Sequence, residues 1–322
     1  MQRSRKWAPR VMVFAAALMS FSTLAEEPAA APAAPQSTVG QQVPISETTD
    51  LRSVLLEIDR IQAEQGNSRI LVIFDIDNTV LTMPQALGGD AWFNYHADLV
   101  ARGSDPDFAS MDELFEAQEV LFGLGSMVLT QPDIPGMLDE IHADGVDTFL
   151  LSARGPTLYN ATRKQLNRNA VALRSPVPCS FLVCDLDGEF TASDVKALLN
   201  QMDLLEPEER VRPIVLRDGL MLVAGQNKGK MLHLLLAALG GNRYDHVIFI
   251  DDSARNTLAV AGSDLPIALT VFHYTRFEET VSDQELADTH GQWQTVRSAL
   301  CASIESGICG SAKTDKPESQ TE

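Results

Sequence analysis

Short apolar runs that alternate with amphipathic stretches constrain the fold of this chain more than any other feature. The runs have the length of strands, and the stretches between them have the spacing of helices. The runs are Ile70–Phe74, Thr148–Leu151, Ser180–Val183, His246–Ile250 and Ile267–Phe272, and the stretches include Pro156–Asn169, Ala192–Met202 and Gly229–Leu239. This alternation predicts an α/β fold in which a parallel sheet carries helices on both faces. In such sheets, ligands bind at the carboxyl ends of the strands.

One interval between the runs is too long for a simple crossover helix. It extends from Thr79 to Thr148 and contains the helix-like stretch Met111–Leu124. We expect residues 84–132 to form a helical cap insertion, with residues 47–83 and 133–300 forming the core. A later Asp-Gly step, at Asp218-Gly219, lies between two apolar segments and predicts a β-hairpin.

The first 25 residues have the pattern of a secretory signal peptide. A basic start is followed by the mostly apolar segment Val11–Phe21, which is too short for a membrane anchor and ends near the small residue Ala25. Cleavage there predicts a periplasmic or secreted protein with no stable membrane span. From their composition we expect residues 26–46 to be an Ala/Pro-rich linker and residues 301–322 to be a polar C-terminal tail.

The four cysteines fit an oxidising compartment, in which three pairings are open. They are Cys179, Cys184, Cys301 and Cys309. A Cys301–Cys309 bond is the first expectation because it would close the C-terminal end, whereas Cys184 lies in an apolar run and equally suits a buried thiol. The cysteines do not have the spacing of zinc ligands, because no second pair of Cys or His residues lies at the short interval that zinc sites use.

The charge of the chain restricts its partners. The chain has 25 lysines and arginines but 44 aspartates and glutamates, which gives a formal net charge of −19. Such a surface repels nucleic acid polymers and anionic membranes, so a small substrate is expected. A phosphate site in this chain must therefore be made positive locally. The sequence leaves the oligomeric state open.

Polar residues follow three of the apolar runs. The first run ends at Asp75-Ile76-Asp77-Asn78-Thr79, the second at Ser152-Ala153-Arg154, and the run His246–Ile250 at Asp251-Asp252, while Lys228 opens the helix-like stretch before that run. Parallel strands would bring all these side chains to one edge of the sheet. Paired carboxylates can hold a hard cation, and one of them can attack a phosphorus atom.

Taken one at a time, these residues have simpler interpretations. Asp75 and Asp77 suit a turn or a helix cap, and Ser152 suits a helix N-cap. Lys228 alone fits a solvated surface charge, and Asp251-Asp252 fits any acidic loop. Their shared position after apolar runs favours the functional interpretation.

Two rival interpretations of an acidic pair are weaker. A calcium-binding loop at Asp75 is excluded, because Val80 stands at the position of its glycine and Ala86 at that of its bidentate glutamate. Asp185 and Asp187 also follow an apolar run. That pair lacks a threonine, and no run ending in Ser or Thr follows it before the lysine, so its Asp-Gly step is interpreted as a turn.

These motifs resemble the haloacid dehalogenase (HAD) superfamily of aspartate-nucleophile phosphohydrolases. The ordered set extends from Asp75 to Asp252, and its details look closest to an uncharacterised family of bacterial exported or effector-like proteins within that superfamily. Those details are Phe74-Asp75-Ile76-Asp77-Asn78-Thr79, Asn227-Lys228-Gly229 and Phe249-Ile250-Asp251-Asp252. The resemblance implies a Rossmannoid core with strand order 3-2-1-4-5 and a cap after the first strand.

The resemblance also implies catalytic roles. Asp75 would be the nucleophile, and Asp77 would protonate the leaving oxygen and later activate water. Lys228 would neutralise the nucleophile and the phosphate, Ser152 would bind a phosphoryl oxygen, and Thr79 would shape the loop. These assignments place the catalytic chemistry at the ends of three strands.

The same resemblance implies a Mg²⁺ cofactor. Asp75, Asp251 and the backbone carbonyl of Asp77 would hold the ion, with Asp252 as a further or water-mediated ligand. One departure concerns Arg255 and Asn256, which stand where many relatives have another aspartate. Mg²⁺ prefers a few hard oxygens together with phosphate and water, which this set provides.

Two further features of the sequence bear on the substrate. Arg154 is expected either to contact phosphate or to pair with a carboxylate of the cap. The aromatic segment Trp92–His96 suits either stacking on a substrate or packing between cap helices, and the second interpretation is the simpler.

The sequence therefore favours a Mg²⁺-dependent phosphomonoester phosphatase that acts on a small phosphorylated substrate through an aspartyl-phosphate. The alternative is a non-catalytic HAD-like domain that binds a phosphorylated ligand or protein partner in the cell envelope. A third interpretation, a structural envelope protein, is supported only by the Ala/Pro-rich leader. The intact set of motif residues favours the enzyme.

Overall fold

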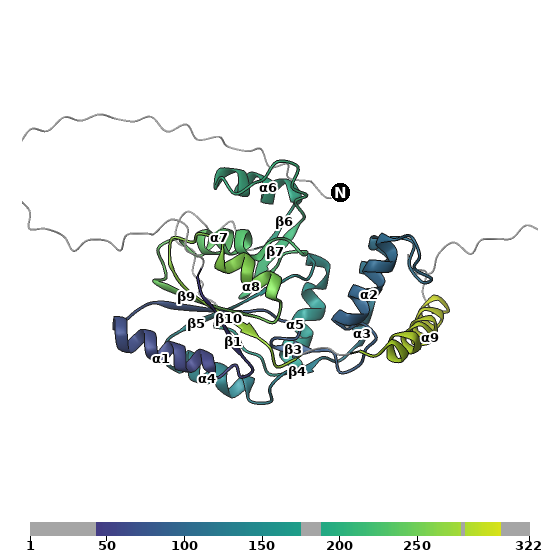
Figure 1. The fold of residues 1–322 in the computed structure, drawn as a ribbon, viewed down its shortest axis with the longest axis horizontal. Helices are drawn as coiled ribbons and strands as arrows, with labels where there is room; N and C mark the ends of the chain where they lie inside the picture. The colour runs from purple at the N-terminus through teal and green to yellow at the C-terminus, as the bar shows by residue number, and fades with distance from the viewer. Residues whose placement is uncertain (1–42, 175–187, 278–280, 304–322) are drawn as a thin grey trace, which may run out of the picture. The chain divides into compact units, whose positions relative to one another are not determined.

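A mainly parallel sheet forms the centre of the fold (Figure 1). The computed structural model describes residues 43–174, 188–277 and 281–303, which all belong to one compact unit, residues 39–322. The sheet order is β1-β10-β9-β2-β5-β8-β7-β6, and only the pairings of β7 with β8 and with β6 are antiparallel. Its strands are β1 Ile45–Thr48, β2 Ile70–Phe74, β5 Asp147–Ser152, β6 Gly188–Phe190, β7 Ile214–Arg217, β8 Leu220–Leu222, β9 His246–Asp251 and β10 Ala268–Tyr274.

Helices cover both faces of this sheet. On one face α1 (Ser53–Gln65), α4 (Ile134–Ala143) and α5 (Tyr159–Arg168) pack against Ile70, Val72 and Phe74 of β2. On the other face α6 (Ala192–Gln201), α7 (Lys228–Ala238) and α8 (Ala254–Ala261) pack against Leu71 and Ile73. Because successive strand residues point to opposite faces, β2 must be apolar throughout, and all five of its residues are buried.

The interval after β2 contains a small sheet and two helices. β3 (Leu81–Thr82) pairs antiparallel with β4 (Val128–Leu129), and α2 (Asp90–Ala101) and α3 (Met111–Leu124) lie between them in the sequence. A separate apolar cluster joins these helices to α9 (Asp283–Cys301), with Trp92 and Trp293 as its largest side chains. Residues 84–132, which we refer to as the cap, therefore contribute to an apolar cluster of their own, and α9 completes it.

The sheet differs from the expected five strands in the order 3-2-1-4-5, because three further strands extend it at its two edges. β1 extends one edge, and β7 and β6 extend the other. The strand beside β5 is β8, and not the expected run Ser180–Val183, which lies outside the described residues. β1 also begins at Ile45, so the last residues of the expected linker belong to the sheet.

The hairpin predicted at Asp218-Gly219 is confirmed. β7 and β8 pair antiparallel across it, and both turn residues have positive φ, 52° for Asp218 and 78° for Gly219. Two such residues form the type of turn that matches the twist of the strands. The hairpin places β8 beside β5.

Several sequence expectations fall outside the described residues. They include the signal peptide, the rival pair Asp185 and Asp187, and three of the four cysteines. Cys301 takes part in a disulfide bond, and its partner is not among the described residues. Of the helices in the described part of the chain, none combines the length and the apolar character needed to cross a membrane.

Candidate active site

The ends of β2 and β9 bring two of the expected carboxylates together. The two strands are parallel neighbours, with Phe74 opposite Ile250, and the backbone N–H of Asp75 donates to the carbonyl of Ile250 over 2.8 Å. Asp75 and Asp251 are therefore adjacent at one sheet edge. Both are buried, with 5% and 0% of their surface exposed.

Lys228 lies between these two carboxylates. Its Nζ donates to Oδ2 of Asp251 over 2.6 Å and to Oδ1 of Asp75, and only 1% of its surface is exposed. Lys228 is the first residue of α7, where the side chain of Asn227 caps the helix by accepting from the N–H of Lys230. The helix start thus places a buried ammonium at the strand edge.

Asp251 is held by further donors from the segment that follows β9. The backbone N–H of Ser253 donates to its Oδ1 over 2.9 Å, and the amide of Asn256 donates to both oxygens over 3.1 and 3.2 Å. The amide of Asn256 and the N–H of Ser253 therefore orient Asp251.

Thr79 connects the first motif to the last. Its hydroxyl accepts from the backbone N–H of Asp252 over 3.0 Å, and its own carbonyl accepts from the hydroxyl of Thr130. The carbonyl of Asp252 lies 2.9 Å from Nε2 of His273 on β10. These contacts hold the loops after β2 and β9 side by side.

Burial shifts the pKa values of the charged side chains at this sheet edge. Burial, reinforced by the charge of Asp251 and opposed by Lys228, raises the pKa of Asp75 to about 8. Burial and the neighbouring carboxylates likewise raise the pKa of Asp252 to about 8. For Lys228, burial lowers the pKa, but the charges of Asp251 and Asp75 outweigh it and leave the pKa raised. One ammonium therefore does not balance all the carboxylates.

The residues present fit a hard divalent cation. Asp75, Asp251 and Asp252 can each offer one carboxylate oxygen, and these oxygens lie within 4.8 Å of one another. Carboxylate oxygens are the ligands that Mg²⁺ prefers. A dication would also favour the ionised forms of Asp75 and Asp252, which burial and the neighbouring carboxylates disfavour.

Asp77 is paired with Arg154. Nε of Arg154 donates to Oδ2 of Asp77 over 2.9 Å, and Nη2 donates to Oδ1 over 2.7 Å. Nη1 donates to the hydroxyl of Thr162 on α5, and the guanidinium lies 4.5 Å from the ring centroid of Phe122 on α3. Of the two expectations for Arg154, the structure shows carboxylate pairing, but with Asp77 in place of a cap residue.

Ser152 ends β5, the other neighbour of β2. Its side chain is buried, and its hydroxyl accepts from the backbone N–H of Arg154 over 3.2 Å. The structure thus brings Asp75, Lys228 and Asp251 into direct contact, and it joins Ser152 to Asp77 through Arg154.

Sequence reasoning missed several residues that hold this site. They are Thr162 and Phe122, which hold Arg154, and His273, which contacts Asp252. Thr162 and Phe122 come from helices and carry no motif. Asn256, which the sequence marks only as a departure, binds the oxygens of Asp251.

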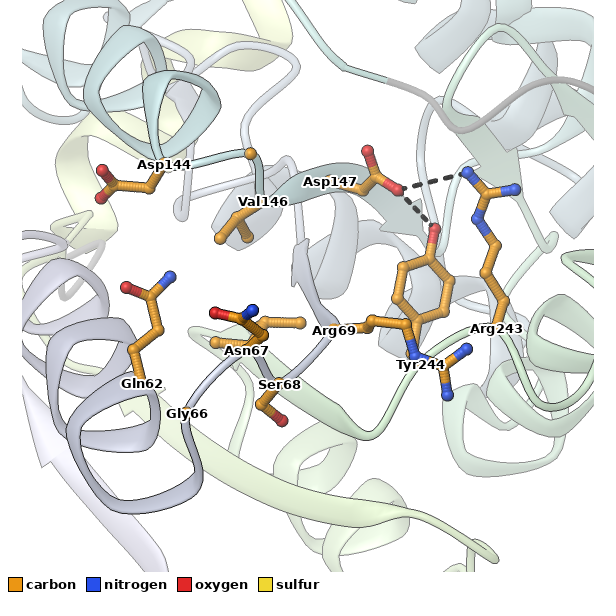
Figure 2. Close-up of a pocket in the computed structure, with 12 residues that line it drawn as sticks. Gln62, Gly66, Asn67, Ser68, Arg69, Asp144, Val146, Asp147, Arg243 and Tyr244 are labelled. Atoms are coloured by element: carbon orange, nitrogen blue, oxygen red, sulfur yellow. Dashed lines mark hydrogen bonds and ion pairs between the residues drawn. The ribbon is translucent and has the colours of Figure 1, made fainter.

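A separate pocket lies at the opposite ends of the central strands. Its volume is about 660 Å³, and its lining includes Ile70 at the start of β2, Asp147 at the start of β5 and Tyr244 just before β9. In Figure 2, Asp147 pairs with Tyr244 and Arg243, so its charge is already compensated. The motif residues do not line this pocket.

Solved structures with some similarity include two of a bacterial enzyme. One is the class C acid phosphatase from Bacillus anthracis, with 15% identity, 75% of this chain and 86% of that chain covered, and a TM-score of 0.36. The same phosphatase with tungstate bound matches at 16% identity and a TM-score of 0.34, with the same coverage. Similarities this low establish neither the fold nor the function of this chain.

The comparison with protein families is more extensive. No curated protein matches the chain. A family model described as "Protein of unknown function (DUF2608)" matches residues 48–304, which include every strand-edge residue described above. The chain therefore belongs to this DUF2608 family.

Proposed function

We propose that this protein is a Mg²⁺-dependent phosphatase with a HAD-like core, which hydrolyses small phosphomonoesters through an aspartyl-phosphate on Asp75. One observation carries the proposal. Asp75 and Asp251, at the ends of adjacent parallel strands, share the buried ammonium of Lys228. Phosphoryl transfer through an aspartyl-phosphate needs a carboxylate nucleophile and neutralising positive charge beside it, and this arrangement supplies both.

The order of the middle strands supports the HAD-like core. Numbered along the chain, β2, β5, β8, β9 and β10 are the first to the fifth parallel strands of the central part. Across the sheet they lie in the order β8-β5-β2-β9-β10, which is 3-2-1-4-5. The nucleophile follows the middle strand of these five, with Ser152 and Asp251 on either side.

In the first step, a carboxylate oxygen of Asp75 attacks phosphorus, and the bond from phosphorus to the leaving oxygen breaks. Asp77 gives that oxygen a proton. Lys228 keeps the negative charge of Asp75 tolerable beside the phosphoryl group, and the hydroxyl of Ser152 donates to a phosphoryl oxygen.

In the second step, Asp77 takes a proton from water, and the water oxygen attacks the same phosphorus atom. The bond between phosphorus and the oxygen of Asp75 breaks, which releases phosphate and restores both carboxyl groups. Arg154 fixes the orientation of the Asp77 carboxyl group for both steps, because two of its N–H groups donate to the two oxygens of Asp77.

Asp75, Asp251 and Asp252 would hold Mg²⁺, together with the backbone carbonyl of Asp77. When bound, the ion supplies positive charge for the phosphoryl oxygens. The acidic chain supports a small substrate over a polymer, and the N-terminal pattern supports export to the periplasm or beyond.

The test is hydrolysis of a chromogenic phosphomonoester by the purified mature chain with Mg²⁺. We expect turnover that Asp75→Asn abolishes and that the matched control Asp187→Asn, in the rival acidic pair, retains. A panel of phosphorylated metabolites then identifies the substrate class. If no member of the panel is hydrolysed, while binding of phosphorylated compounds is measurable by calorimetry, the proposal is wrong and the non-catalytic alternative replaces it.

A further inference from the structure

A second group of metal-ligand side chains lies where the cap meets α9. Nδ1 of His96 is 2.7 Å from Oδ2 of Asp105, and Nδ1 of His290 is 2.8 Å from Oδ2 of Asp107. One ligand atom from each of His96, Asp105 and Asp107 lies within 4.8 Å of the others. We refer to these four residues as the cap–α9 cluster. It shares no residue with the strand-edge site.

The two carboxylates of the cluster are shielded from solvent. The side chains of Asp105 and Asp107 are 0% exposed, and that of His96 is 3% exposed. Aromatic rings form the surroundings, since Trp92 and Phe108 have centroids 4.9 and 5.0 Å from the ring of His96. Two negative charges in such surroundings require compensation, because desolvation of an unpaired carboxylate is very costly.

Neutral donors supply part of this compensation. The backbone N–H groups of Asp107 and Phe108 donate to Oδ1 of Asp105, and the amide of Gln294 donates to Oδ1 of Asp107 over 2.5 Å. In the described part of the chain, the ion-pair partners of these carboxylates are the two imidazoles, and none is a lysine or arginine. A bound cation would supply the full positive charge that these neutral donors lack.

We infer that the cap–α9 cluster binds a divalent transition-metal ion of the Zn²⁺ class. One dication balances two carboxylates, and it leaves the imidazoles neutral, which is the form that ligates metals. The imidazole nitrogen of His96 and the carboxylate oxygens of Asp105 and Asp107 supply three Zn²⁺ ligands, and His290 holds one of them, Asp107, in place. Mg²⁺, in contrast, prefers oxygen alone.

The location gives the ion a structural consequence. His96 belongs to α2, Asp105 and Asp107 to the segment before α3, and His290 to α9. The apolar contact beside the cluster, Phe108 against Trp293, joins the same elements with ring centroids 5.6 Å apart. Metal binding therefore fastens α9 to the cap.

The test is uptake of Zn²⁺ by the full mature chain after treatment with a chelator, in saturating Mg²⁺. Calorimetry and elemental analysis measure binding, and Co²⁺ serves as a spectroscopic probe of imidazole ligation. We expect one Zn²⁺ per chain and a higher melting temperature with Zn²⁺. His290→Ala and the isosteric Asp107→Asn should each weaken the affinity at least about tenfold.

Two controls make the outcome decisive. His233→Ala, which removes a histidine outside the cluster, should retain Zn²⁺ uptake. Asp251→Asn, which changes the strand-edge site, should also retain it. His290 is 52% exposed, so the fold should tolerate its substitution. The inference is overturned if the wild-type chain takes up no Zn²⁺, if His290→Ala and Asp107→Asn bind as the wild type does, or if uptake is lost only in Asp251→Asn.

Discussion

Arg154 presents one edge of its guanidinium to Asp77, with Nε and Nη2 donating to the two carboxylate oxygens over 2.9 and 2.7 Å. The guanidinium is itself held by Thr162 on α5 and stacked on Phe122 of the cap helix α3. Asp77 is therefore oriented from the cap as well as from the core. If Asp77 is the acid and base of the reaction, the position of the cap controls proton transfer through Arg154.

Arg154→Lys should lower kcat about 10- to 100-fold and leave KM nearly unchanged. Lysine keeps the positive charge but cannot form the two parallel hydrogen bonds, so the proton-transfer group loses its orientation. Steady-state kinetics on a chromogenic phosphomonoester measure both constants. Arg168→Lys is the matched control. Arg168, on α5, is likewise an arginine that contacts the cap, since it donates a hydrogen bond to the hydroxyl of Ser126. A rise in KM at unchanged kcat would instead show that Arg154 binds the substrate phosphate.

Part of this site was predictable from the sequence because parallel strands end at a common edge. Asp75 and Asp251 follow apolar runs, and those runs could be identified as strands from their length and composition alone. Their adjacency then follows from the parallel pairing of β2 and β9. Lys228 was predictable as the start of a helix, although its burial between the two carboxylates was not.

The partners of Arg154 were not predictable, because they depend on how helices pack. Thr162 and Phe122 are ordinary helix residues, and nothing local distinguishes them from their neighbours. The strand beside β5 was not predictable either. Ser180–Val183 has the composition of a strand, but the place beside β5 is taken by β8, the second arm of the Asp218-Gly219 hairpin. Which strand lies beside β5 depends on pairing between distant segments, and the composition of a segment does not predict that pairing.

Lys228→Met should destabilise the metal-free protein by about 3–5 kcal/mol, because it leaves buried carboxylates without their cation. Adding Asp75→Asn removes one of those charges, so the double variant should lose less stability than the sum of the two single variants. Urea denaturation in the presence of a chelator measures the free energy of unfolding. Lys230→Met is the control, because its partners Glu206 and Glu209 are more exposed, and should cost less than about 1 kcal/mol. Additive losses would contradict the coupling of Lys228 to Asp75.

Stabilisation by Mg²⁺ should grow as the pH rises from about 5 to about 8. Burial raises the pKa of Asp75 and Asp252 to about 8, whereas a free aspartate titrates near about 4. Between these values the metal-free folded chain holds protons that the unfolded chain has released, so its stability falls as the pH rises. A bound cation favours the ionised carboxylates, so in its presence the stability of the folded chain should no longer fall as the pH rises.

Melting temperatures with Mg²⁺ and with a chelator, compared across this pH range, test the expectation. In the Asp251→Asn variant, Mg²⁺ should raise the melting temperature much less than in the wild type at the upper end of this pH range. An increment that does not depend on pH would show that the carboxylates at the strand edge are not linked to metal binding.

Gly229→Ala should destabilise the protein by about 1–3 kcal/mol, because α7 lies too close to α8 for a side chain at this position. A Cβ on Gly229 would overlap the carbonyl oxygen of Ala259 and lie 2.9 Å from Cβ of Ser263. Relief of that overlap requires α7 to move away from α8. This movement would displace Lys228 from Asp75 and Asp251, so the enzymatic activity should fall together with the free energy of unfolding. Gly136→Ala, in α4, is the matched control, since a Cβ there meets no atom within 4 Å, and it should be neutral or stabilising by up to about 1 kcal/mol. Chemical denaturation of both variants decides the point, and equal stabilities would mean that the start of α7 is not held by its contact with α8.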